Sequence, residues 1–156
     1  MLEQVGIEKT LQRSVFFGQD IEIVLMGGLR DGIDAVKALC LGADATAFGT
    51  STIIAGGCIA CMQCHIGQCV TGIATQDPEH EKRYKPNVEA KNIHRFLESV
   101  RWQIAAITLS LGHTDVQQLS SDDLVALTPE AAAITGLPYE PDRPDSVPDD
   151  LRMQAK

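Results

Sequence analysis

The chain has 156 residues, of which 44% are hydrophobic and 22% are charged, a composition typical of one globular domain or part of one. Its net charge is −8, and its 13 Lys and Arg residues form no basic stripe, so we expect no nucleic-acid partner. No apolar run reaches the roughly 18 residues of a membrane span. Because no basic and then apolar signal segment is present either, we expect no membrane partner and a cytoplasmic location.

The first part of the chain predicts a βαβ unit. Residues 2–17 favour a helix, and residues 21–26 form a short, β-branched apolar run, typical of a parallel strand covered on both faces. Asp31 is a good N-cap for the next helix, which Gly42 ends, and residues 43–48 predict a second buried strand. A crossover of this kind makes the two strands parallel.

The second part is predicted to be mostly helical. The longest helix spans residues 88–111 and carries an apolar stripe that includes Phe96 and Trp102 as expected packing residues. Two shorter helical pieces start at Ser121 and Thr128. Further helix boundaries are marked by Pro86, Gly112, Pro129 and Gly136. From residue 138 onward, prolines and aspartates predict an acidic tail that is disordered or wrapped on a partner.

Each predicted strand ends in glycines. Gly27 and Gly28 follow the first strand, and Gly49 with Thr50 follows the second, 21 residues after Gly28. Glycine lets backbone N–H groups approach a ligand closely, and each turn leads into an electropositive helix N-terminus. The pair therefore indicates a phosphate site to which Arg30 could add charge, although ordinary βα turns have the same pattern.

Four of the five cysteines lie within residues 58–69, a stretch we call the cysteine loop: Cys58, Cys61, Cys64 and Cys69. In a reducing compartment such a density indicates a soft metal or an iron–sulfur cluster, and the x2-x2 spacing of the first three is typical of a cluster clamp. A zinc site that uses His65 or Cys69, and buried structural or redox thiols, are the alternatives. Cys40, on the apolar side of a predicted helix, is expected to be buried and inert, and the other histidines to be surface residues.

Several motifs together resemble the FMN-binding synthase domain of the glutamate synthase large subunit. They lie between about Ile21 and Leu111 and comprise Gly27–Arg30, Lys37–Asp44, Phe48–Thr50, Gly57–Cys58, Cys64–His65, Cys69 and Gly72–Pro78. The resemblance implies that Gly27, Gly28, Leu29, Arg30, Gly49 and Thr50 bind FMN through its phosphate. It also implies that Cys58, Cys64 and Cys69 hold a [3Fe-4S] cluster, with Cys61 as an additional thiol; a [4Fe-4S] cluster that involves Cys61, or zinc, is the alternative. Met26 and Val70 stand where the family usually has Asp and Pro.

The resemblance also implies a fold, an α/β architecture in which this chain supplies the last two βα units of a TIM-type (β/α)8 barrel. We expect residues 1–137 to form this partial barrel domain, with the cysteine loop and C-terminal helices, and residues 138–156 to form the tail. A complete barrel needs roughly 250 residues, so the chain looks incomplete and is expected to need a complementing barrel chain. The family's substrate-binding and acid–base residues lie on earlier strands, which leaves the catalytic residues unknown.

By this resemblance the chain belongs to an oxidoreductase that reductively aminates 2-oxoglutarate to glutamate and receives electrons from a donor subunit. Two alternatives come from other functional classes: a noncatalytic iron–sulfur electron-transfer or interaction module, and a zinc-stapled structural domain.

Overall fold

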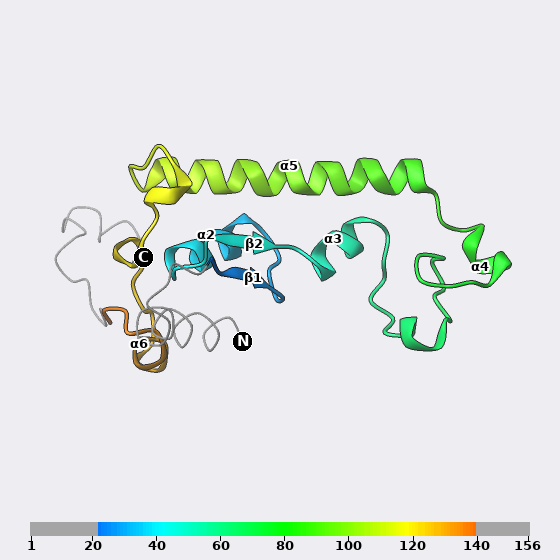
Figure 1. Ribbon diagram of the computed structural model, residues 1–156, viewed down its shortest axis with the longest axis horizontal. Helices are drawn as coiled ribbons and strands as arrows, with labels where there is room; N and C mark the ends of the chain where they lie inside the picture. Colours follow the sequence, from blue (N-terminus) through cyan, green and yellow to red (C-terminus); the bar gives the residue numbers. More distant parts are fainter. Residues whose placement is uncertain (1–21, 140–156) are drawn as a thin grey trace, which may run out of the picture.

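The computed structural model describes residues 22–139. The predicted helix over residues 2–17 and nearly all of the acidic tail lie outside the described residues. The elements in chain order are β1 (Val24–Met26), α2 (Gly32–Cys40), β2 (Ala45–Ala47), α3 (Thr50–Ala55), η1 (Cys64–Ile66), α4 (Pro78–Glu81), α5 (Pro86–Ser110), η2 (Val116–Gln118), η3 (Ser121–Asp123) and α6 (Pro129–Thr135). Figure 1 shows α5 running along one side of the molecule, with α2, the sheet and α3 beside it and the cysteine loop toward the α4 end.

The two strands pair in parallel, as predicted. Val24 lies opposite Ala45, and Met26 lies opposite Ala47. Just before this ladder, the carboxylate of Asp44 accepts a hydrogen bond from the backbone N–H of Ile23 at 2.6 Å, which ties the start of one strand to the other. The mixed α/β class and the βαβ order are therefore confirmed, although both strands are shorter than predicted.

The prediction that the first strand is covered on both faces is wrong for the described residues. Leu25 is 8% exposed and packs with Leu29 and Ala38, whereas Val24 and Met26 are 61% and 75% exposed. Side chains alternate between the two faces of a strand, so one face of β1 is covered and the other is open. Burial on the second face requires elements that residues 22–139 do not supply.

Helix α2 has the boundaries that its caps predict. The Oδ1 atom of Asp31 accepts hydrogen bonds from the N–H groups of Ile33 and Asp34, both at 3.0 Å, and Gly42 has a left-handed φ of 96°. Its N-terminus packs closely on α5, because Gly32 N–H donates to Gln103 Oε1 at 2.7 Å and a Cβ at Gly32 would lie 2.8 Å from the Val100 carbonyl oxygen. The Cys40 end of α2 packs against the segment that follows α5, next to Leu119.

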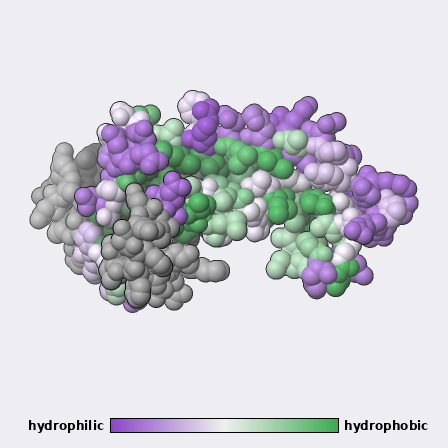
Figure 2. Space-filling view, viewed as in Figure 1, coloured by the Kyte–Doolittle hydropathy of each residue, from purple (hydrophilic) through white to green (hydrophobic). Residues whose placement is uncertain are grey.

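Helix α5 confirms the predicted long helix, with Pro86 in its first turn. Its Phe96 ring meets Phe48 edge to face, with the ring centroids 6.0 Å apart, as expected of a packing residue. The prediction that Trp102 is also a packing residue is wrong. Its side chain is 67% exposed, and the Arg101 guanidinium lies over its ring. Figure 2 shows polar residues along the outer side of α5 and apolar residues on the side facing the sheet. Within residues 22–139, no helix is long and apolar enough to cross a membrane.

The segment after α5 folds back onto it through short capped turns. Thr128 caps α6 through a 3.1 Å bond from Ala131 N–H, and Gly136 ends it with a φ of 68°, both as predicted. His113, expected to be a surface residue, has a side chain that is 26% exposed, and its Nε2 lies 2.8 Å from Asp123 Oδ1. The hydrogen bond with His113 and the N–H of Ser120 lower the pKa of Asp123 below its ordinary 3.8.

Candidate phosphate site and cysteine loop

The glycines that follow β1 adopt conformations that favour glycine. Gly27 and Gly28 have φ values of 106° and 73°, in the left-handed region. A Cβ built at Gly27, at Gly28 or at Gly49 would meet no atom within 4 Å. The space beside both turns is therefore open on the side where a side chain would stand, and a ligand can approach the backbone there.

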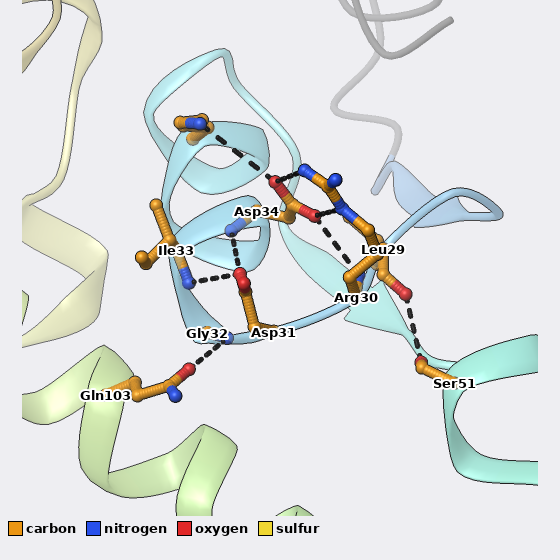
Figure 3. A network of polar contacts seen from close by, with 9 residues as sticks. Leu29, Arg30, Asp31, Gly32, Ile33, Asp34, Ser51 and Gln103 are labelled. Atoms are coloured by element: carbon orange, nitrogen blue, oxygen red, sulfur yellow. Dashed lines mark hydrogen bonds and ion pairs between the residues drawn. The ribbon is translucent and has the colours of Figure 1, made fainter. Parts of the chain in front are cut away.

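A side-chain hydrogen bond joins the two turns. Ser51, in the first turn of α3, donates from Oγ to the Leu29 carbonyl oxygen at 2.9 Å. Figure 3 shows this bond at the point where the segment after β1 passes the start of α3. The carboxyl ends of the two parallel strands thus lie side by side, and the predicted phosphate residues Leu29, Gly49 and Thr50 belong to neighbouring segments.

Arg30 is engaged by Asp34, a residue that the sequence reasoning did not single out. Asp34 Oδ2 accepts from the Arg30 Nε at 2.9 Å and from the Arg30 backbone N–H at 3.2 Å (Figure 3). The Asp34 side chain is buried, and the Arg30 hydrogen bond holds the pKa of its carboxyl below 3.8. The i,i+4 spacing of opposite charges was the available sequence signal. Because the Arg30 guanidinium remains exposed, it can still face solvent or an anion, but its charge is shared with Asp34.

The four thiols of the cysteine loop differ in exposure. Cys64 is exposed, Cys58 and Cys61 are half-buried, and Cys69 is 2% exposed. In residues 22–139 no group of three or more His, Cys, Asp and Glu side chains lies close enough to hold a metal ion. The thiols that the sequence predicts as ligands, Cys58, Cys64 and Cys69, are therefore not gathered into one set.

The backbone of the first half of this loop is unusual. Ala60 and Met62 have left-handed φ values of 54° and 59°, which non-glycine residues adopt rarely. The N–H of Ala60 lies 3.4 Å from the Cys58 sulfur. The Nδ1 atom of His65 lies 3.1 Å from the Met62 carbonyl oxygen, so this ring is engaged within the loop.

Cys69 begins a turn whose polar groups surround its sulfur, and we call residues 69–74 the Cys69 turn. Its sulfur lies 3.4 Å from the Thr71 hydroxyl oxygen. That hydroxyl, followed by the N–H groups of Ala74, Thr71 and Ile73, lowers the pKa of the Cys69 thiol to about 7. Hydrogen bonds aimed at sulfur favour the thiolate, which is the form that binds metals.

A cavity of about 530 Å³ lies between η1 and the Cys69 turn. Cys64, Gly67 and the run from Ile73 to Asp77 line it. Ile73 and Ala74, whose N–H groups face the Cys69 sulfur, thus also form a wall of the space beside Cys64. Thiols on a loop beside such a space fit the donor chemistry of a soft metal or an iron–sulfur cluster.

Cys40 has the opposite environment. It is buried in the core beside Val36 and Leu119, and burial raises the pKa of its thiol to about 11. A thiol that stays protonated and inaccessible at neutral pH is a structural residue, as predicted.

Comparison with known proteins identifies the family. Residues 4–114 match the family described as "Conserved region in glutamate synthase". The archaeal-type glutamate synthase [NADPH] of Thermotoga neapolitana is 39% identical over 97 residues, which cover 62% of this chain and 19% of the relative. The corresponding protein of Dehalococcoides mccartyi is 36% identical over 119 residues, 74% of this chain and 24% of the relative.

A glutamate synthase large subunit-like protein of Rhizobium meliloti is 34% identical over 134 residues, which cover 76% of this chain and 30% of the relative. The matches therefore span between about a fifth and a third of the length of these curated relatives. The family match covers most of the chain, including both glycine turns and the whole cysteine loop. The chain belongs to the glutamate synthase family.

Proposed function

We propose that this chain is part of an FMN- and iron–sulfur-dependent oxidoreductase that reductively aminates 2-oxoglutarate to glutamate. The observation that carries the proposal is the pair of open glycine turns, joined by Ser51 and followed directly by a four-cysteine loop, in a chain of the glutamate synthase family. The relatives named above are called glutamate synthases, which supports the reaction class.

In this proposal the glycine turns bind the FMN phosphate. Gly27, Gly28 and Leu29 contribute from the first turn, Gly49 and Thr50 from the second, and Arg30 adds positive charge at the rim. The open space at each glycine supports close approach of a phosphate to the backbone. FMN, when bound, supplies electron and hydride transfer to an imine; this chain's residues bind and orient it.

The cysteine loop is proposed to hold a [3Fe-4S] cluster through Cys58, Cys64 and Cys69. The thiol chemistry and the cavity beside Cys64 support this assignment. Since these three thiols are not gathered, the loop must change conformation around the cluster, and the left-handed Ala60 and Met62 lie in the part that would move. A [4Fe-4S] cluster that includes Cys61, or zinc, is the alternative occupant.

We further propose how this chain fits into a complete barrel and which partners it meets. We place β1 and β2 as the last two strands of a (β/α)8 barrel, with residues 1–137 as the partial domain and 138–156 as the tail. The open face of β1, where Val24 and Met26 are exposed, supports a complementing barrel chain or segment that covers it. An electron-donor subunit would meet the cysteine loop, which lies away from the sheet (Figure 1).

A noncatalytic electron-transfer module is the second candidate. The position of the cysteine loop, with Cys64 exposed, favours it, because an exposed cluster can exchange electrons with a partner without a substrate site on the same chain.

One anaerobic purification tests these proposals. The chain is isolated with and without the rest of its barrel, and the optical spectrum, flavin content, iron, sulfide and zinc are measured. The oxidoreductase proposal predicts FMN and iron together when the barrel is complete, with formation of glutamate from 2-oxoglutarate and ammonia. Iron and sulfide without flavin or turnover would favour the electron-transfer module, and a colourless protein that contains zinc would contradict both.

A further inference from the structure

The thiols of the cysteine loop are held in very different ways. Cys69 is the one that is buried, whereas Cys64 is exposed and Cys58 is half-buried with the Ala60 N–H 3.4 Å from its sulfur. A ligand whose position is set before the iron arrives lowers the conformational entropy that is lost when the cluster assembles. Cys69 is the candidate for that fixed ligand.

Two contacts from outside the Cys69 turn hold it in place. Arg83 donates from Nη1 to the Val70 carbonyl oxygen at 3.1 Å. Gly72, with a left-handed φ of 83°, lies so close to α4 that an added Cβ would overlap the His80 carbonyl oxygen. Within the turn, Gly72 N–H donates to the Cys69 carbonyl oxygen at 3.1 Å. The turn is therefore fastened to α4 and to the segment that follows it.

The Thr71 hydroxyl is the side-chain group that this turn brings to the sulfur, at 3.4 Å. In a free thiol either atom could donate the hydrogen, but a thiolate bound to iron carries no proton, so in the loaded protein the hydroxyl must be the donor. A donor to a ligand sulfur fixes the ligand's orientation and stabilises the more negatively charged, reduced state of a cluster.

We propose that Thr71 is a positioning residue for the iron–sulfur cluster: its hydroxyl holds the Cys69 sulfur in a preset ligand position and raises the reduction potential of the bound cluster. This inference rests on the proposed role of Cys69 as a ligand. Thr71 is not itself a ligand, and its hydroxyl is expected to raise the reduction potential of the cluster.

The test compares the full 156-residue chain with Thr71→Val, which keeps the shape and removes the hydroxyl, and with Thr71→Ser, which keeps the hydroxyl. Each protein is reconstituted anaerobically with ferrous iron and sulfide, after circular dichroism has shown equal helix content. The midpoint potential is measured by spectroelectrochemical titration, and iron release to a chelator is timed. We expect Thr71→Val to show a lower potential and iron release roughly 10–100-fold faster, and Thr71→Ser to behave like the parent chain.

Each result distinguishes this inference from the proposed function. A parent chain that binds no iron–sulfur cluster, or a Cys69→Ser variant that keeps it unchanged, overturns the ligand assignment and the inference with it. A Thr71→Val cluster with the parent potential and release rate overturns the role of Thr71 alone. If Thr71→Val takes up no cluster, uptake of a cluster by Thr71→Ser supports the role of the hydroxyl. If neither variant takes up a cluster, that role is contradicted.

Discussion

Ser51 donates a hydrogen bond to the carbonyl oxygen of Leu29 across 22 positions of sequence, at 2.9 Å. The bond links the first turn of α3 to the segment that follows β1, just beyond the carboxyl ends of the two parallel strands (Figure 3). It therefore sets how far apart the two glycine turns stand, and a phosphate bound by both turns depends on that separation.

Replacing Ser51 by alanine should lower the free energy of unfolding by about 1 kcal/mol, because a part-buried carbonyl loses its donor. It should also weaken FMN binding in the assembled barrel. Urea unfolding and flavin fluorescence measure the two effects. Thr52→Ala is the control, since Thr52 lies in the same short helix and its Oγ1 donates to the Phe48 carbonyl oxygen without joining the turns. Equal losses of FMN affinity in both variants would contradict the linking role of Ser51.

Gly49 gives a sharper test of the phosphate site than Gly28. At Gly49 the φ of −102° suits any residue and an added Cβ meets nothing, so Gly49→Val should cost only about 1 kcal/mol as a changed N-cap. Gly28→Val should cost about 1–3 kcal/mol, because its φ of 73° strains a β-branched residue. We expect both variants to lose FMN on gel filtration. A folded Gly49→Val protein that retains FMN with parent affinity would remove this turn from the site.

Local signals explain which parts of the fold the sequence predicts. Asp31 and Thr128 cap helices through their own side chains, and Gly42 and Gly136 end them, so each boundary depends on a few neighbouring residues. The open face of β1 was not predicted, because an apolar strand has the same composition whether or not the elements that cover it are present.

The pair of His113 and Asp123 should make stability depend on pH in acid. The folded-state pKa of Asp123 is lowered, so its contribution is fully present above the ordinary value of 3.8 and is lost as pH falls through the folded-state pKa. Asp123→Asn should therefore destabilise the protein at pH 6, and its difference from the parent should shrink below about pH 4. Asp122→Asn, at an exposed neighbouring carboxylate, is the control in urea unfolding. A pH-independent difference for Asp123→Asn would contradict the assignment.

The face of β1 that residues 22–139 leave open should make the chain associate when it is expressed alone. Burying an exposed Val or Met side chain contributes about 1.5–3 kcal/mol, and the two-stranded sheet of the described residues has unpaired edges. Val24→Thr with Met26→Gln should raise the concentration at which association begins by about tenfold or more. Sedimentation velocity over a range of concentrations measures this. A monodisperse parent monomer that unfolds cooperatively would show that nothing needs to cover this face.

The candidate site was predictable only in part. Glycine after a strand and clustered cysteines are signals within short stretches, so both the turns and the loop could be located. The partner of Arg30, Asp34, was not predicted, although its i,i+4 spacing was an available signal. The Thr71 contact to Cys69 depends on a turn whose conformation is set by Arg83 and by the close approach of His80. Such contacts between segments leave no periodic pattern in the sequence.

The ligand set of the cluster can be decided by single serine substitutions, because serine keeps the size of cysteine but binds iron poorly. If the family pattern holds, Cys58, Cys64 and Cys69 are the ligands and Cys61 is a bystander. If local x2-x2 spacing decides instead, Cys58, Cys61 and Cys64 form the clamp of a four-iron cluster and Cys69 is a distant fourth ligand or spare. The burial of Cys69 and the donors around its sulfur favour the first pattern.

We therefore expect Cys61→Ser to keep the iron content, optical spectrum and paramagnetic signal of the reconstituted chain, and Cys69→Ser to lose all three. Cys40→Ser serves as the control for thiol number, because Cys40 is buried in the core away from the cysteine loop and should affect stability without affecting iron. If Cys61→Ser loses the cluster while Cys69→Ser keeps it, the three-iron assignment is wrong. That result would also weaken the proposed synthase chemistry, since the x5-x4 spacing of the three cysteines is what links this loop to that cluster type.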